Sequence, residues 1–241
     1  MRAVFLADAH LELPSDDNYR KLLRFLDGLH GSTDTLFIMG DLFDFWVGFP
    51  SDPFPHYEPV LSALERLKQS GCRIIYFEGN HDFHMGSRFR QRLGAEIHTG
   101  PALLTVQGRR LFLCHGDQIN RADHGYRLLR LMLHNPFTRA AVSVVPPSLA
   151  LRLRARLQRT SRAGYHAKQS RWNYTDIVRG FGRQLRSQGC QGLVTGHFHF
   201  SLLEQLDGTP FTLLSLGDWL DQFTYGEMVD GELRLCHFHD A

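Results

Sequence analysis

The chain has 241 residues, with 27 Lys and Arg against 25 Asp and Glu, and a formal net charge of +2. Its 43% of hydrophobic residues excludes intrinsic disorder and is sufficient for one domain with a sizeable core. A cytoplasmic location is expected, because the sequence shows no signal peptide, no CxxC spacing among its four cysteines and no apolar run of the roughly 18 residues that span a membrane.

Short apolar runs alternate with amphipathic stretches along the chain. Strands are predicted at residues 4–7, 35–39, 73–77, 110–114 and 192–195, and helices at residues 19–29 and 60–69. Strands at 211–216 and 232–238 are expected to close the fold as an antiparallel part. Uninterrupted apolar strands that end at Gly or Asp are typical of buried sheets in a layered α/β fold. No internal repeat is present, so a single domain over residues 1–241 is expected.

Residues 125–165 are predicted to form a helical insertion with both basic and apolar character. Between residues 121 and 190 there are 14 basic and two acidic residues, so this segment carries +12 and the rest carries −10. Two helical faces follow residue 148, one of leucines and one of arginines: Leu149, Leu153 and Leu157, against Arg152, Arg156 and Arg159. The pattern indicates a helix that meets an anionic membrane surface, or an ordinary packed helix with a solvated arginine face.

Five short polar motifs lie at the ends of predicted strands. They are Asp8-Ala9-His10, Gly40-Asp41-Leu42-Phe43-Asp44, Gly79-Asn80-His81-Asp82, Cys114-His115-Gly116-Asp117 and Gly196-His197-Phe198-His199. In open α/β sheets, ligands bind at the carboxyl ends of the strands. Side chains two apart on an extended segment point the same way, so Asp8 is expected to converge with His10, and His197 with His199.

The motifs contain seven candidate metal ligands with oxygen and nitrogen donors, which are Asp8, His10, Asp41, Asn80, His115, His197 and His199. Such a donor set suits Mn, Fe, Co or Zn better than Mg or Ca. Seven ligands exceed what one ion needs, and with one bridging carboxylate they fill two adjacent sites. Each motif alone is more typical of a turn or a core histidine, but the five together favour two divalent ions, a device for phosphoryl hydrolysis.

The order of these motifs resembles that of the calcineurin-like metallophosphoesterases, over nearly the whole chain. The resemblance implies a β-sandwich flanked by helices that holds a dinuclear metal centre, with Mn as the expected metal. It places Asp8, His10, Asp41 and His199 at one metal and Asp41, Asn80, His115 and His197 at the other. Asp41 would bridge the two ions, and a metal-bridged hydroxide would attack phosphorus in line.

Within that family, the chain is similar to the UDP-2,3-diacylglucosamine hydrolases of lipid A biosynthesis. The similarity lies in the motifs around Asp8, Asp41 and His115, in Trp46 and in Asp123. It implies a helical lid that takes the acyl chains of a nucleotide lipid, cleavage of its pyrophosphate to UMP and lipid X, and action at the cytoplasmic membrane surface as a peripheral protein. The substrate contacts that it implies are Asp123, Arg162 and Lys168.

His81 departs from those hydrolases, which carry arginine after the Gly-Asn pair, and agrees with the broader family. It is therefore the candidate general acid that protonates the leaving oxygen, with a structural loop residue as the alternative. Asp82, beside it, is expected to raise the pKa of the His81 imidazole. Asp117 is expected to orient a ligand histidine or to cap a turn. The departure indicates a sister branch and leaves the exact substrate open.

Two other classes of function remain. One is a calcineurin-like phosphoesterase with another substrate, either a phosphomonoesterase, a cyclic-nucleotide phosphodiesterase or a nuclease whose +12 segment grips phosphates. The leucine-rich faces of the insertion favour a lipid over nucleic acid. The other class is a non-catalytic scaffold of the same fold, which should have lost metal ligands, whereas all seven are present. The sequence indicates no oligomeric state.

Overall fold

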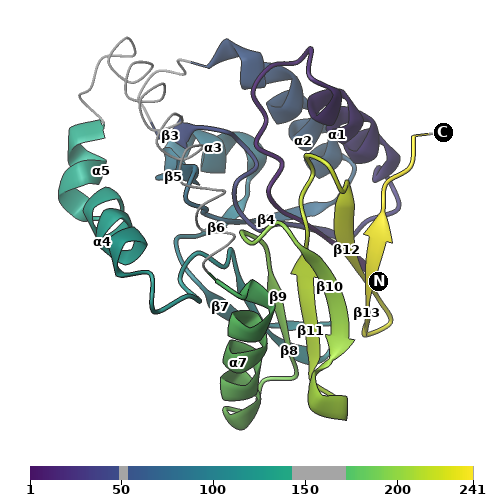
Figure 1. Ribbon diagram of the computed structural model, residues 1–241. Helices are drawn as coiled ribbons and strands as arrows, with labels where there is room; N and C mark the ends of the chain where they lie inside the picture. Colours follow the sequence, from purple (N-terminus) through teal and green to yellow (C-terminus); the bar gives the residue numbers. More distant parts are fainter. Residues whose placement is uncertain (49–53, 143–171, 241) are drawn as a thin grey trace.

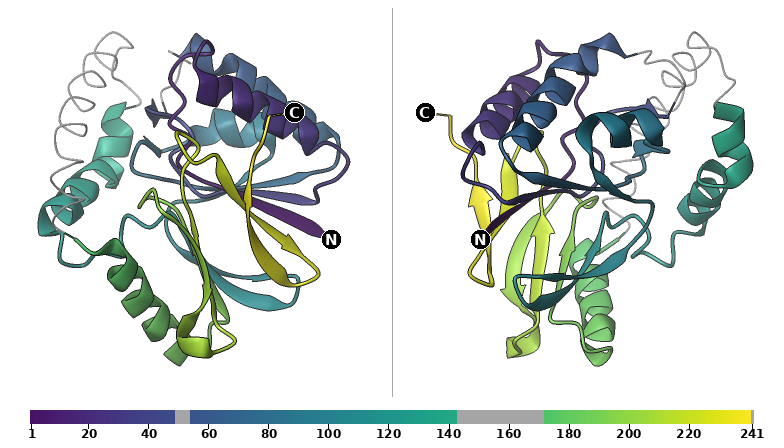
Figure 2. Two further views of the ribbon diagram at one scale, coloured as in Figure 1. Left: turned by 45° about the vertical axis from the view of Figure 1, so that its right-hand side comes forward. Right: turned by 180° about the vertical axis from the view of Figure 1, so that it is seen from behind.

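The structure is a computed structural model and describes residues 1–48, 54–142 and 172–240. Two β-sheets lie face to face at its centre, and helices cover the outer side of each sheet (Figure 1). The view from behind in Figure 2 shows the same layers, with α4 and α5 standing to one side of them. The predicted β-sandwich flanked by helices is therefore confirmed for the described residues.

The first sheet has six strands in the order β13-β12-β1-β2-β4-β6. They are β1 (Arg2–Leu6), β2 (Thr35–Ile38), β4 (Arg73–Phe77), β6 (Glu96–His98), β12 (Thr224–Val229) and β13 (Glu232–His237). The strands β1, β2, β4 and β6 are mutually parallel, whereas β12 is antiparallel to both β1 and β13. The parallel register places Phe5 beside Phe37 and Phe37 beside Ile75, which makes an apolar row across the sheet.

The second sheet has five strands in the order β10-β11-β9-β8-β7. They are β7 (Ala102–Val106), β8 (Arg109–Cys114), β9 (Gly192–Thr195), β10 (Ser201–Gln205) and β11 (Thr212–Leu216). The expected antiparallel closing part is confirmed where β13 pairs with β12 and where β11 pairs with β10, but β11 is parallel to β9 on its other side. A short third pair joins β3 (Trp46–Val47) to β5 (Asp82–Phe83) in parallel.

The helices on the first sheet are α1 (Asp17–Gly28), α2 (Glu58–Gln69) and α3 (Gly86–Leu93), and α7 (Tyr174–Ser187) covers the second. Two further helices begin the predicted insertion, α4 (His124–Leu133) and α5 (Pro136–Val142), and two 3-10 turns occur at Pro55–Tyr57 and Leu206–Gly208. The helix expected from residue 148 and the candidate residues Arg162 and Lys168 lie outside the described residues. The single-domain organisation stays a prediction.

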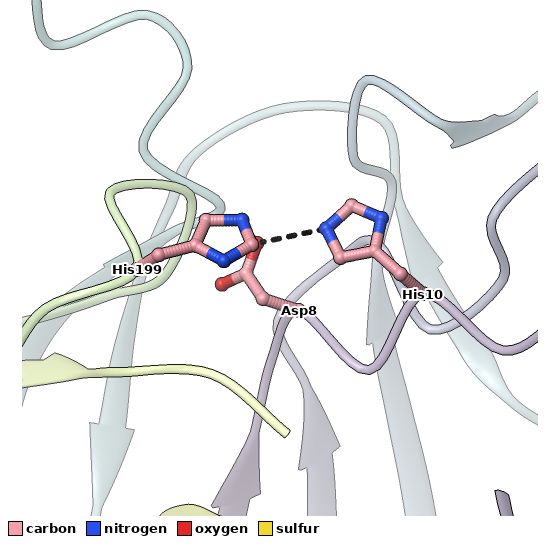
Figure 3. A group of neighbouring side chains, drawn as sticks. All are labelled: Asp8, His10 and His199. Carbon is pink, nitrogen blue, oxygen red and sulfur yellow. Dashed lines mark ion pairs between the residues drawn. The ribbon is translucent and has the colours of Figure 1, made fainter. Parts of the chain in front are cut away.

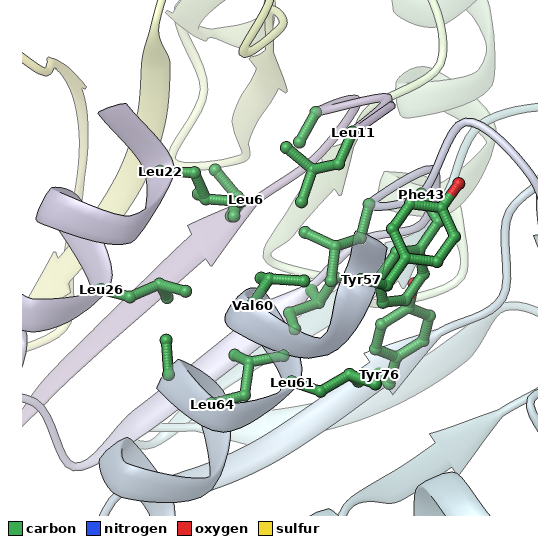
Figure 4. Close-up of a cluster of buried hydrophobic side chains, with 14 of the residues drawn as sticks. Leu6, Leu11, Leu22, Leu26, Phe43, Tyr57, Val60, Leu61, Leu64 and Tyr76 are labelled. Atoms are coloured by element: carbon green, nitrogen blue, oxygen red, sulfur yellow. The ribbon is translucent and has the colours of Figure 1, made fainter. Parts of the chain in front are cut away.

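Three apolar cores hold the layers together. In β1, Val4 and Leu6 face α1 and α2, while Ala3 and Phe5 face the second sheet. Figure 4 shows the first of these cores, with leucines from both helices packed over β1. Because the central strands are buried on both faces, they show no polar alternation, and this is why they are recognisable in the sequence as continuous apolar runs.

The predicted central elements are confirmed, with ends that differ by at most two residues. The prediction missed the strands β3, β5, β6, β7, β10 and β12 and the helices α3 and α7. The edge strands β7 and β10 alternate exposed and partly buried residues, so they lack a continuous apolar run. Among the described residues, no helix is long and apolar enough to cross a bilayer. All four cysteines are free.

Candidate metal centre

Five central strands carry the candidate ligands to one end of the sandwich. Asp8 follows β1, Asp41 follows β2 and Asn80 follows β4, each within three residues of the strand end. From the second sheet, His115 follows β8 directly and His197 follows β9. Ligand binding at the carboxyl ends of parallel strands is the usual arrangement in α/β sheets, and here both sheets contribute to it.

The backbone at these positions is tightly turned. Asp8, His10, Asp41, His197 and His199 all have positive φ, between 44° and 71°. The premise that Asp8 with His10, and His197 with His199, lie on extended segments is therefore wrong. Left-handed conformations of non-glycine residues are uncommon and gather at functional sites, where the surrounding structure holds them.

Two glycines let the loops of the two sheets touch. A Cβ atom on Gly40 would lie 2.6 Å from Nδ1 of His115, and the φ of Gly40 is +89°. A Cβ atom on Gly196 would lie 2.5 Å from Oδ2 of Asp8. A side chain at either position would displace a candidate ligand, so these glycines allow the close approach of the two sheets.

Asp8, His10 and His199 form a first group, whose donor atoms all lie within 4.8 Å of one another (Figure 3). Oδ1 of the fully buried Asp8 lies 3.9 Å from Nε2 of His10 and 3.7 Å from Nε2 of His199. The two imidazole rings stack with centroids 5.2 Å apart. One carboxylate oxygen thus faces two ring nitrogens across a gap wider than a hydrogen bond.

Asp41, His115 and His197 form a second group of the same kind. Oδ1 of Asn80 lies 3.1 Å from Nε2 of His115, which adds a carbonyl oxygen to this group. Nδ1 of His115 donates to the carbonyl oxygen of Met39 over 2.8 Å, which fixes the ring so that Nε2 faces the group. The structure therefore brings together all seven residues singled out as ligands.

Asp41 lies between the two groups. Its Oδ2 atom is 3.8 Å from Nε2 of His10 in the first group and 3.4 Å from Nε2 of His115 in the second. Its Oδ1 atom accepts a hydrogen bond of 2.8 Å from the backbone N–H of His81. Asp41 is thus the carboxylate placed to bridge two ions.

Two buried polar atoms in the first group indicate whether a cation would fit there. Oδ1 of Asp8 and Nε2 of His10 are buried, and neither has a hydrogen-bond partner among the described residues. Buried polar atoms without a partner are rare and destabilising. A divalent cation between them would satisfy both, and the oxygen and nitrogen donors are those that Mn, Fe, Co or Zn accept.

The close packing of buried carboxylates and imidazoles shifts the pKa values of several candidate ligands. Burial raises the pKa of Asp8 to about 6. Burial also raises the pKa of Asp41, but its neighbours His115, His81 and His10 together hold that pKa well below its usual range. Burial lowers the pKa of His115, but Asp41, helped by the carboxylates of Asp8 and Asp117, keeps that pKa well above its usual value. The electrostatic centre of the cluster is therefore Asp41.

Asp82 has a different role from the expected one. Its buried carboxylate accepts hydrogen bonds from the backbone N–H groups of Asp41, Leu42 and Phe43, at 2.7 to 3.2 Å, and from the hydroxyl of Tyr76. It caps the loop that carries Asp41. Burial among these groups, with the Asp41 charge nearby, raises the pKa of Asp82 to about 7.

The carboxylate of Asp117 joins the His115 loop to the insertion. Its Oδ2 atom accepts a hydrogen bond of 2.8 Å from the Tyr126 hydroxyl and another from Nε of Arg130, both on α4. The Tyr126 ring also lies 5.8 Å from the His197 ring, centroid to centroid. Asp123 caps the N-terminus of α4 by accepting from the backbone N–H of Tyr126. A substrate contact of Asp123 stays a prediction.

His81 lies at the rim of the centre. Nδ1 of His81 is 2.9 Å from the carbonyl oxygen of Asp44, and its ring meets the His10 ring edge-on at 4.7 Å. Donor atoms of His10, Asp44 and His81 make a third close group that shares His10 with the first. The imidazole is thus held beside the candidate ligands, and among the described residues its Nε2 atom makes no hydrogen bond.

Asp218 is the residue that sequence reasoning missed. Its Oδ2 atom lies 3.6 Å from Nδ1 of His199, and its Oδ1 atom accepts backbone N–H groups of Leu220, Asp221 and Gln222. It therefore orients His199 from behind. A signal for it was present, because Gly217-Asp218 follows the strand β11 as Gly40-Asp41 follows β2.

Comparison with known proteins agrees with this geometry. The family model described as calcineurin-like phosphoesterase matches residues 1–201. The chain belongs to the calcineurin-like phosphoesterase family. The family membership predicted from the sequence motifs is thereby confirmed.

Two curated relatives align with almost the whole length of the chain. It is 32% identical over 238 residues to the UDP-2,3-diacylglucosamine hydrolase of Aeromonas salmonicida (strain A449), with 98% of this chain and 92% of the relative covered. It is 31% identical over 241 residues to the protein of the same name from Aeromonas hydrophila subsp. hydrophila, with 98% of both chains covered. The predicted similarity to these hydrolases is therefore confirmed.

The position of Asp41 leads to a test of the centre. Asp41→Ala is expected to abolish metal occupancy at both sites, because the shared carboxylate is removed. Metal content is measured by mass spectrometry of the purified protein, with circular dichroism to verify folding. The control is Asp27→Ala on α1, an exposed carboxylate that faces Arg66. Two metals retained per Asp41→Ala chain would contradict the bridging position.

Proposed function

We propose that the chain is a dinuclear-metal hydrolase that cleaves the pyrophosphate of UDP-2,3-diacylglucosamine to UMP and lipid X. The observation that carries the reaction class is the pair of ligand groups that meet at Asp41. The substrate is taken from the named relatives, which align over nearly the full chain. Mn is the proposed metal, since the donors mix carboxylate, amide oxygen and imidazole.

When bound, two divalent ions would polarise the phosphoryl oxygens and lower the pKa of a water molecule. The residues of the chain give this chemistry its geometry. Asp82 and Asp218 fix the loop of Asp41 and the ring of His199, so the donors are held in place before substrate arrives. Such preorganisation reduces the cost of arranging charges during the reaction.

His81 is the proposed general acid. The carbonyl of Asp44 accepts from Nδ1–H, which leaves Nε2 to hold a proton for the leaving oxygen. The contact of the His81 ring with the His10 ring, at the rim of the centre, supports this role. The ring reaches the site from the loop between β4 and β5, one residue beyond the candidate ligand Asn80.

The start of the insertion supports a lipid substrate. On α4 and α5, the large apolar side chains of Leu128, Leu131, Met132 and Phe137 are between 60% and 86% exposed. Apolar surface of this kind marks a contact with lipid or with another apolar partner. We propose that residues 125–165 form a lid for the acyl chains and bring the enzyme to an anionic membrane surface, where nucleic acid is a poor partner.

The substrate is tested by incubating the Mn-loaded protein with UDP-2,3-diacylglucosamine and following UMP by chromatography. UMP is expected only with metal, and protein treated with a chelator is the control. An aryl phosphate is assayed in parallel. Turnover of the aryl phosphate without release of UMP would refute the proposed substrate and leave the phosphoesterase reaction class in place.

The role of His81 is tested by His81→Ala. Loss of a general acid is expected to lower kcat by on the order of 100-fold or more, while the metal content stays unchanged. The control is His98→Ala, which removes an imidazole paired with Glu96 at the edge strand β6. Unchanged kcat in His81→Ala would exclude the proposed acid.

The membrane surface is tested with the double variant Met132→Ser and Phe137→Ser. Loss of two exposed apolar side chains is expected to lower the affinity for phosphatidylglycerol vesicles by on the order of tenfold, as measured by co-sedimentation. The control is Leu13→Ser with Leu203→Ser, two exposed leucines outside the insertion. Equal vesicle binding by both double variants would argue against α4 and α5 as the contact surface.

A further inference from the structure

A cavity of about 380 Å³ lies behind α4, on the side of β8 and α7. It is separate from the metal centre, since none of the seven candidate ligands lines it. The segment from Gly116 to Ile119 forms part of its wall, so the cavity begins directly after His115. Its volume falls within the range of small-ligand sites.

Part of the cavity lining is apolar. Phe112 of β8 and Phe181 of α7 both line it, and their rings meet edge-on with centroids 5.6 Å apart. Pro101 and Leu131 also line it, and the Leu131 side chain is 69% exposed. Ile119 is a buried residue of the same lining. This surface suits a hydrocarbon chain or another apolar group.

Another part of the lining is cationic. Arg121, Arg127 and Arg130 all line the cavity, and Asp117 is the one carboxylate among the described residues of the lining. That carboxylate is already paired with Arg130. Among the described residues, Arg121 and Arg127 have no carboxylate partner, and Nη1 of Arg127 lies 3.4 Å from the backbone oxygen of Arg121. Two arginines thus line the same cavity without a carboxylate partner among the described residues.

We infer that this cavity is a second, non-catalytic site for a phosphate monoester that carries an apolar chain. A phosphate monoester brings nearly two negative charges at neutral pH, which matches the two unpaired guanidinium groups. Arginine binds phosphate through two parallel hydrogen bonds, so Arg121 and Arg127 can share its oxygens. A carboxylate brings one charge and matches the site less well. The chain attached to the phosphate lies against Phe112, Phe181 and Leu131.

The site is tested by calorimetric titration of the Mn-loaded full chain with dihexanoyl phosphatidic acid below its micelle concentration. Arg121→Gln with Arg127→Gln is expected to weaken binding at least tenfold. The control removes two exposed arginines elsewhere, Arg20→Gln with Arg234→Gln, and is expected to bind as the parent does. Equal binding by both double variants, or no binding by the parent chain, would overturn the site.

A second comparison separates a lipid from a small phosphate. Glycerol 3-phosphate has the same charged group without the chains, and it is expected to bind more weakly. Leu131→Ser is expected to weaken binding of dihexanoyl phosphatidic acid and to leave glycerol 3-phosphate unchanged. Equal affinity of the parent chain for the two ligands would overturn the apolar half of the inference. The readout is binding, so it does not depend on the proposed hydrolysis.

Discussion

The arrangement of the site depends on one buried carboxylate that faces imidazoles on two sides. Asp41 is 2% exposed and lies within 4 Å of both His10 and His115. A carboxylate in such surroundings is stable only where compensating positive charge is fixed beside it. His115, after β8, supplies that charge because its pKa is held well above the usual value, whereas burial holds the pKa of His10, after β1, well below it. The contact of the two sheets therefore stabilises the buried carboxylate of Asp41.

Burial of this polar cluster destabilises the fold, and the apolar packing beneath the cluster offsets that destabilisation. Three apolar cores run through the layers, and the strands β1, β2 and β9 are buried along most or all of their length. The loops above are tied to one another by short contacts, such as the backbone N–H of Gly196 to the oxygen of His115 at 2.7 Å. Strained backbone at Asp8 and Asp41 persists because these loops have no room to relax.

Much of this could be predicted from the sequence, for physical reasons. Strands buried on both faces are continuous apolar runs, and a polar residue at each strand end stands out against them. The edge strands β7 and β10 lack that contrast, so they were missed. The ligands were recognisable by residue type, but the left-handed turns that aim His10 and His199 depend on contacts between distant loops. Asp82 faces the Asp41 loop rather than His81 because β4 and β2 are neighbours, and spacing along the chain does not reveal this.

The hydrogen bonds of Asp117 have a mechanical consequence. Tyr126 and Arg130 lie one turn apart on α4, and both bind the same carboxylate, two residues after His115. Two attachments one turn apart prevent rotation as well as separation, so α4 behaves as a rigid extension of the second sheet. The first two turns of α4 and the loop that carries His115 are therefore expected to move as one body.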